Sequence, residues 1–256
     1  MKIVIDAHMI GEKETGNETY VLNLLRGFQA LSGNDLFVVA TAHPEVLRAK
    51  AKLDERFQLA PVSTSPFQRL LRDLPRLVES NEADVLHVTY TGPWRSGCPL
   101  VVTIHDLSFI AHPEWFSLRD RWVLKIGVGR SARNATRLIA ISKYSRDSLC
   151  SYYSIGTGQV GVTPLAADRT FRKMEEDAAR IQLERLYPAL RRPFLIAVGN
   201  LQPRKNIIRI VEAFGLFKHR TGAPHLLVIV GKALWRKAEV EAAVTQSGVA
   251  SEIVFT

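Results

Sequence analysis

The strongest candidate for chemistry is a short basic segment that joins a predicted strand to a predicted helix. The strand ends at Gly199, and the helix begins near Asn206. Arg204 and Lys205 lie just before the helix, where free N–H groups and the helix dipole favour an anion. An arginine grips phosphate oxygens as a two-pronged donor, and a lysine adds a point charge. The spacing predicts a pyrophosphate-binding turn; the alternative is a pair of solvated basic residues.

The turn after the first predicted strand carries Gly16. A glycine at the mouth of a helix lets a ligand approach the backbone N–H groups. Thr15 and Glu18 have the spacing of a capping box that opens the helix. The alternative is a glycine needed only for the turn. Neither the dinucleotide fingerprint G-x-G-x-x-G nor the P-loop sequence is present, which argues against NAD-type and ATP-type chemistry.

His105 and Asp106 follow the predicted strand at residues 100–104. Ligands of open α/β sheets bind beyond the carboxyl ends of the strands, so this pair stands where a substrate would bind. Successive residues of a strand face opposite ways, so the two side chains need not act together. The alternative is a core histidine with its hydrogen bonds satisfied.

Ser142 and Lys143 follow another predicted strand, at residues 136–141. Ser142 is placed to cap the next helix, and the free N–H groups there, with Lys143, could hold an anion. Plain helix capping is the alternative.

The elements that position these turns are short apolar strands that alternate with amphipathic helices. The helix pattern is clearest at residues 20–31 and 207–217. Alternation of this kind predicts a doubly wound α/β fold with parallel sheets. The predicted strands are Lys2–Asp6, Leu36–Ala40, Asp84–Val88, Leu100–Ile104, Thr136–Ile141, Gln159–Thr163, Phe194–Val198, Leu226–Val230 and Glu252–Phe255.

The alternation of predicted strands and helices is interrupted once, at residues 165–192. That stretch is charged and ends near two prolines, so we interpret it as a linker with a bridging helix. Residues 1–164 then form a first Rossmann-like domain. Residues 193–256 form a second, partial one, which is shorter than the ~100–150 residues of a typical domain.

Composition and charge narrow the choice of partner. The chain has 256 residues, a net charge of +9 and two cysteines. The charge favours a polyanionic partner or simply a basic surface, but the basic residues are dispersed, unlike those of a nucleic-acid-binding arm. Two cysteines predict no disulfide framework and no metal site. We expect a cytoplasmic protein without a membrane span or a signal peptide.

Taken together, the turns resemble those of family 4 retaining glycosyltransferases, which have the two-domain GT-B fold. Mannosyl- and rhamnosyl-type enzymes of bacterial surface polysaccharides are the most similar kind. The resemblance is carried by the motifs I-D-A-x-M-x-G, T-G-N-E-T-Y, D-V-L-H, T-I-H-D, I-A-I-S-K-Y-S, P-L-A-A-D, V-G-N-L-Q-P-R-K-N and L-V-I-V-G-K.

The resemblance implies transfer of a sugar from a GDP-, UDP- or dTDP-linked donor to a glycan or lipid-linked acceptor. His105 would approach the donor sugar, and Gly16 would lie against the donor phosphates or the acceptor. Lys205, helped by Arg204, would neutralise the departing diphosphate without a metal or another cofactor. Asp106, Ser142 and Lys143 are further candidate contacts for the acceptor or an anion.

Two departures from the family pattern matter. Asn200 stands where many members carry an arginine, which removes one contact to the diphosphate. The family's E-x7-E element, which binds the donor sugar and ribose, would lie past Thr256, so we expect a second domain that is incomplete. The alternative function is therefore a non-catalytic remnant that binds sugar or phosphate, or acts as a scaffold. Reading the open reading frame past Thr256 separates the two.

An aromatic and basic cluster in the first half could lie on an anionic membrane. It predicts a peripheral position at the inner face of the membrane, and the alternative is core aromatics beside surface arginines. Its members are Trp94, Arg95, Trp115, Phe116, Arg119, Arg121 and Trp122.

Overall fold

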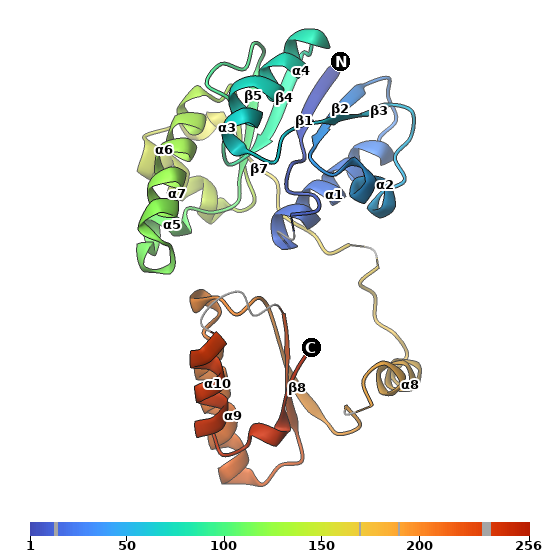
Figure 1. Ribbon diagram of the computed structural model, residues 1–256, viewed down its shortest axis with the longest axis vertical. Helices are drawn as coiled ribbons and strands as arrows, with labels where there is room; N and C mark the ends of the chain where they lie inside the picture. Colours follow the sequence, from blue (N-terminus) through green and yellow to red (C-terminus); the bar gives the residue numbers. More distant parts are fainter. Residues whose placement is uncertain (13–14, 169, 189, 232–236) are drawn as a thin grey trace. The chain divides into compact units, whose positions relative to one another are not determined.

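The computed structural model describes residues 1–12, 15–168, 170–188, 190–231 and 237–256. The chain forms two compact units, Met1–Asp168 and Arg169–Thr256. Figure 1 shows an α/β arrangement in each of them. This confirms the predicted fold class.

The first unit is built on a seven-stranded sheet in the order β3-β2-β1-β4-β5-β6-β7. All neighbouring strands are parallel. The order steps outward from β1 in both directions, as in doubly wound folds, so a topological switch point lies between β1 and β4. The strands are β1 Lys2–Asp6, β2 Leu36–Thr41, β3 Phe57–Pro61, β4 Val85–Thr89, β5 Leu100–Ile104, β6 Arg137–Ala140 and β7 Val160–Val162.

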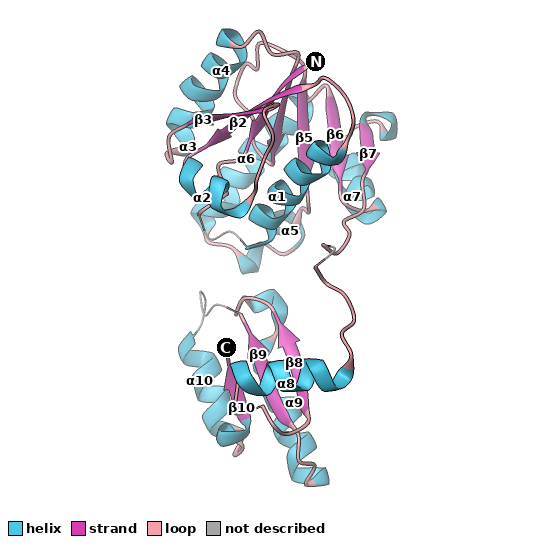
Figure 2. Cartoon of the chain, turned by 90° about the vertical axis from the view of Figure 1, so that its right-hand side faces the viewer, coloured by secondary structure: helices cyan, strands magenta, loops and turns pink. Residues whose placement is uncertain are grey.

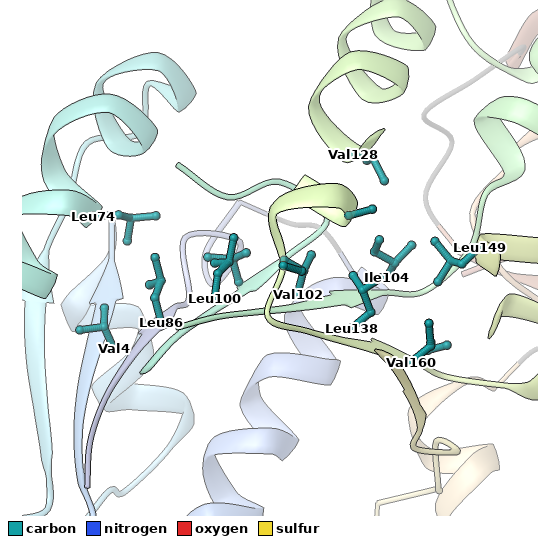
Figure 3. Packing of buried hydrophobic residues seen from close by; sticks show 14 of the residues in the cluster. Val4, Leu74, Leu86, Leu100, Val102, Ile104, Val128, Leu138, Leu149 and Val160 are labelled. Atoms are coloured by element: carbon teal, nitrogen blue, oxygen red, sulfur yellow. The ribbon is translucent and has the colours of Figure 1, made fainter. Parts of the chain in front are cut away.

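Helices cover both faces of this sheet because alternate strand residues point to opposite sides. Ile5 of β1 belongs to a core cluster with side chains of α1 and α2, and Val4 belongs to a second cluster that includes side chains of α4, α6 and α7. Figure 3 shows the core on the Val4 face, with Leu74, Leu86, Val102 and Ile104 among its side chains. The helices are α1 Thr15–Ala30, α2 Pro44–Lys50, α3 Pro66–Gln68, the π-helix η1 Arg69–Asp73, α4 Leu74–Ser80, α5 Ser108–Ala111, η2 Pro113–Trp115, α6 Leu118–Asn134, α7 Lys143–Tyr153 and η3 Thr157–Gln159.

The second unit has a three-stranded parallel sheet in the order β10-β9-β8 (Figure 2). Leu227 and Ile229 of β9 pack with α9 and α10, while Leu226 and Val228 pack with Leu183 of α8. The elements are α8 Glu176–Leu186, β8 Phe194–Val198, η4 Pro203–Lys205, α9 Ile207–Thr221, β9 Leu226–Val230, α10 Lys237–Gln246, η5 Ala250–Glu252 and β10 Ile253–Phe255.

The nine predicted strands are confirmed: four have the predicted ends, and the ends of the other five differ by one residue. The strand β3 was missed: its polar Gln58 and terminal Pro61 interrupt the apolar pattern, which an edge strand tolerates. The strand β8 forms an edge of the described sheet, and its Ile196 and Val198 are exposed.

The segment 165–192, predicted as a linker and bridging helix, contains α8. The division between the two compact units falls within it, after Asp168. A bridging role for α8 stays a prediction.

Candidate functional site

The carboxyl end of β5 places His105 in an aromatic setting. Its ring meets Tyr20 of α1 edge-on, with ring centroids 4.7 Å apart, and meets Tyr90 at 5.5 Å. The residue is 9% exposed, and its Nε2 atom is buried without a hydrogen bond to any described residue. The alternative of a satisfied core histidine is therefore wrong. A buried imidazole nitrogen without a described partner calls for an explanation, and this one lies at the end of a central strand.

Burial lowers the pKa of His105, and the nearby charge of Asp106 only partly opposes this effect. A lowered pKa keeps the imidazole neutral at pH 7, because the ordinary value is already about 6.5. A neutral imidazole has one donor and one acceptor nitrogen, so it suits a sugar hydroxyl better than it suits a phosphate.

Tyr90, which follows β4, holds its ring against His105 from a strained backbone. Its φ angle is +63°, in the left-handed region that aromatic residues rarely adopt. Its backbone N–H donates to the carbonyl oxygen of Thr103 at 2.9 Å. Strain of this kind costs about 1–3 kcal/mol and tends to gather at functional sites. No local sequence signal distinguishes this tyrosine, which is why it was missed.

A chain of hydrogen bonds joins strands β4 and β5 to Tyr20 of α1, beside His105. The hydroxyl of Thr103 contacts Nε2 of His87 at 2.8 Å and the hydroxyl of Tyr20 at 3.1 Å. Burial lowers the pKa of His87 to about 4. The chain thus links a neutral histidine of β4 to the tyrosine that contacts His105.

Acidification is expected to destabilise the first unit through His87. Between pH 6.5 and about 4 the unfolded chain binds a proton on this residue and the folded chain does not. Stability present above pH 6.5 is therefore lost as the pH falls through that window, by about 3 kcal/mol in total. Urea unfolding at pH 7 and pH 4.5 measures the loss.

The variant His87→Gln is expected to show a smaller loss over the same pH range. The matched control is His112→Gln, which removes an exposed histidine and should behave as the unchanged protein does. If the free energy of unfolding fell equally with pH for the unchanged protein and for His87→Gln, His87 would not be the residue responsible.

The other predicted residues of the first unit surround the same strand ends. Ser142 caps α7 by accepting a hydrogen bond from the N–H of Ser145 at 3.0 Å, which confirms the capping interpretation. The hydroxyl of Ser145 donates to the carbonyl of His105 at 2.8 Å, which ties α7 to the end of β5. Lys143 is exposed at the first position of α7, while Asp106 is exposed and accepts hydrogen bonds from Ser108.

Gly16 is the exposed second residue of α1, and a Cβ atom there would meet nothing within 4 Å. Tyr20 lies one helical turn further along and contacts His105, so the structure places Gly16 on the helix that borders this histidine. The side chain of Thr15 lies outside the described part of the chain. Glu18 accepts from the N–H of Gly11 at 3.4 Å and forms an ion pair with Lys50.

The predicted pyrophosphate turn of the second unit has a defined backbone. Gly199 has a φ angle of +149°, and its N–H donates to the carbonyl of Val230 at 2.8 Å. A 3-10 turn, Pro203–Lys205, follows, and Asn206 in the left-handed region leads into α9. Leu201 is buried beneath the turn and anchors it to the core.

The two cations of this turn are exposed. Arg204 donates from Nε to the side chain of Gln202 at 2.9 Å, and neither Arg204 nor Lys205 forms an ion pair with a described residue. Carbon atoms of Lys205 lie 3.2–3.5 Å from the position that a Cβ would take on Gly199. The absence of a side chain on the glycine therefore leaves room for the lysine side chain. Asn200 accepts a hydrogen bond from the N–H of Gln202 at 2.7 Å through its carbonyl. Two uncompensated cations at the start of a helix favour an anion.

Comparison with known proteins adds a family and a fold. Residues 15–171 match the model of Glycosyltransferase Family 4. The O-antigen chain mannosyltransferase B of Escherichia coli is 22% identical over 135 residues, which are 53% of this chain and 35% of that protein. The matched segment thus spans about a third of that relative.

Solved structures share the fold at low sequence identity. Anabaena Alr3699/HepE in complex with UDP-glucose has a TM-score of 0.71 and 17% identity, covering 100% of this chain and 68% of that one. WaaG, described as a glycosyltransferase involved in lipopolysaccharide biosynthesis, has a TM-score of 0.67 and 13% identity, covering 100% and 70%. A glycosyltransferase from Rickettsia africae has a TM-score of 0.66 and 13% identity, covering 100% and 67%.

Proposed function

The chain belongs to glycosyltransferase family 4, and from that membership we propose that it acts in sugar transfer. The donor is a nucleotide sugar, and the acceptor is a hydroxyl of a glycan or of a lipid-linked glycan. We further propose retention of the anomeric configuration and a role in cell-surface polysaccharide biosynthesis. The solved relative that contains UDP-glucose and the mannosyltransferase relative support the donor class.

The observation that carries the proposal is the uncompensated pair Arg204 and Lys205 beside the start of α9. When the bond between the sugar and the diphosphate breaks, negative charge develops on the leaving group. Fixed cations and helix N–H groups stabilise that charge, as a metal ion would. In this proposal the residues perform this role without a metal or another cofactor.

The transfer step balances without a carboxylate nucleophile. The acceptor oxygen attacks the anomeric carbon on the face that the diphosphate leaves, and the acceptor's proton passes to a diphosphate oxygen. His105, with its unpaired Nε2, binds a hydroxyl of the donor sugar and fixes the ring. Gly16 leaves room for the phosphates or the acceptor at the start of α1.

The direct test is transfer or donor hydrolysis with GDP-, UDP- and dTDP-linked sugars. It uses the polypeptide that the open reading frame encodes, including any residues past Thr256. We expect turnover with one nucleotide class. Ligand binding without turnover would favour the non-catalytic alternative, and silence with every donor would contradict the proposal.

The aromatic residues of the aromatic and basic cluster fall into two groups in the structure, one exposed and one packed against other side chains. Trp94 is 70% exposed and Trp122 is 59% exposed. Phe116, in contrast, packs against the core, and Trp115 stacks on His112 with ring centroids 3.9 Å apart. The core interpretation therefore fits Phe116, and the surface interpretation fits the two exposed tryptophans.

An apolar stripe on α6 joins this surface. Leu118, Trp122 and Ile126 are exposed and lie four residues apart, so they share one face of the helix. Arg119 and Lys125 flank them, and the ammonium group of Lys125 lies 5.6 Å from the centre of the Trp122 ring. No described helix is long and apolar enough to cross a bilayer. We propose that this face of α6 rests on an anionic membrane.

Replacing Trp122 and Ile126 with serine is expected to lower binding to vesicles that contain phosphatidylglycerol by about tenfold. Full burial of one large apolar side chain contributes roughly 1.5–3 kcal/mol, and side chains that rest on a membrane surface bury only part of their area, so the two together contribute about 1.4 kcal/mol. Co-sedimentation measures the binding. The matched control is Leu216→Ser, at an exposed leucine of α9. Equal pelleting with and without anionic lipid would rule out this surface.

A further inference from the structure

A single side chain of α1 contacts both the interior of the first sheet and the end of β5. On β5, Val102 and Ile104 belong to the core on the face that α4, α6 and α7 cover, so Thr103 points toward α1. Tyr20 of α1 reaches this threonine with its hydroxyl, at 3.1 Å. The ring of the same tyrosine meets the imidazole of His105, with 4.7 Å between the ring centroids. Tyr20 therefore joins a buried polar group to a candidate site residue.

The hydroxyl of Tyr20 is held in a buried setting. Thr103 is fully buried, and its hydroxyl also contacts Nε2 of the buried His87 at 2.8 Å. Burial raises the pKa of Tyr20, so the phenol keeps its proton at neutral pH and can donate or accept in this bond. A tyrosine that is held by its backbone at one end and by its hydroxyl at the other has little freedom to swing. Its ring is therefore fixed against His105.

The orientation of the His105 imidazole depends on contacts of this kind. Its Nε2 makes no hydrogen bond to a described residue, and the hydrogen bond from Ser145 reaches only its backbone carbonyl. Tyr20 meets the imidazole at an angle of 74° between the ring planes, and Tyr90 meets it at 63°. Edge-to-face contacts between aromatic rings favour a defined mutual orientation. The two tyrosines thus set the direction in which the imidazole points.

A purely structural role for Tyr20 is the alternative, in which its hydroxyl only satisfies the buried Thr103. The second tyrosine on His105 argues for a role at the site. Tyr90 is held there with a φ angle of +63°, a conformation that costs energy in an aromatic residue. Filling a core does not require such a conformation, whereas holding one imidazole between two rings explains it.

We propose that Tyr20 is a positioning residue, which holds the imidazole of His105 in the orientation that sugar transfer requires. The inference rests on the proposed function and deepens it, since His105 there binds a hydroxyl of the donor sugar. Thr103 and His87 act one step further away, because they fix the hydroxyl of Tyr20. Orientation matters at this point, since a displacement of about 1 Å can lower a rate by about 10²-fold.

Tyr20→Phe keeps the ring and removes its bond to Thr103, so kcat/KM for the donor is expected to fall about tenfold. The lost hydrogen bond sets that scale, since one such bond contributes at most about a factor of ten. The matched control is Tyr152→Phe, at a partly exposed tyrosine of α7 that packs on Tyr153. That control should transfer sugar as the unchanged protein does.

The variant His105→Ala separates positioning from a general effect on the structure. If Tyr20 acts through His105, Tyr20→Phe should lower kcat/KM by no more than about twofold when His105 is already alanine. An equal fall with and without His105 would overturn the positioning role. Should Tyr20→Phe not fold, Thr103→Ser and Thr103→Val replace it, because only the serine keeps the hydroxyl that Tyr20 contacts. Equal rates for these two variants would overturn the proposal as well.

NMR of the protein with isotope-labelled histidine observes the imidazole of His105 without any donor, and His105→Ala identifies its signals. We expect these signals to shift or broaden in Tyr20→Phe and to stay unchanged in Tyr152→Phe. Signals that do not change in Tyr20→Phe, or a rate of transfer that this variant leaves unchanged, would remove the positioning role and keep the function. Changed signals in a protein that turns over no donor would keep the contact that orients His105 and remove the transferase proposal.

Discussion

Replacing Lys205 with alanine is expected to lower the rate of sugar transfer by about 10²–10³-fold. Removing one fixed group that stabilises transition-state charge typically has an effect of this size. The aliphatic part of the Lys205 side chain packs against Gly199. Its ammonium group forms no ion pair with a described carboxylate, so its charge is not neutralised there. The loss should appear in kcat with any donor, because the developing charge belongs to the diphosphate that all donors share.

The side chain of Lys205 is exposed, so the fold should tolerate its removal, with a change in Tm of at most a few degrees. The matched control is Arg209→Ala, which removes an exposed cation from the first turns of the same helix. Arg209 already pairs with Glu212, at 2.7 Å. A similar fall in rate for both variants would show that general basicity matters, and would contradict a specific role for Lys205.

Replacing Gly231 with alanine is expected to destabilise the second unit by about 3 kcal/mol or more. A Cβ at this position would lie 2.2 Å from the carbonyl oxygen of Gly199. The φ angle of +151° is also one that residues with side chains rarely adopt. Backbone strain and overpacking each cost roughly 1–3 kcal/mol. Because the obstructed atom belongs to Gly199, relief of the clash would also displace the predicted pyrophosphate turn.

Urea unfolding, followed by a probe in the second unit, measures this loss. The control is Gly222→Ala, at a φ angle of +60° and with nothing within 4 Å of the added Cβ. In that variant the alanine adopts a strained backbone conformation but clashes with no other atom. Its free energy of unfolding should therefore fall by only about 1–2 kcal/mol. Equal losses for the two variants would show that the contact between Gly231 and Gly199 has no special weight.

Much of the fold was predictable because its signals are local. Apolar runs such as Leu100–Ile104 and Leu226–Val230 lie within single strands, and so their burial could be expected from neighbours in the sequence. The signal for the predicted pyrophosphate turn is equally local, since Gly199, Arg204 and Lys205 lie within a few residues of one another. The positions of the predicted residues follow from strand order, whereas their chemical roles stay predictions.

The parts that were missed depend on contacts between distant segments. Arg69 meets Asp6 only because β3 and β1 end at the same edge of one sheet. Tyr90 adopts a backbone conformation that its residue type disfavours, so its sequence gives no warning. Edge strand β3 lacks the regular alternation that would reveal it. Tertiary structure alone brings these groups together.

The hydroxyl of Thr103 has one proton to give, yet it contacts both His87 and Tyr20. If His87 accepts at Nε2, the tyrosine must donate to Thr103; if His87 donates there, the threonine proton is free to turn toward Tyr20. One tautomer of His87 therefore fixes the direction of both hydrogen bonds, and the other leaves the bond between Thr103 and Tyr20 open to either direction. A serine would preserve that relay, whereas a valine of the same shape would cut it at both ends.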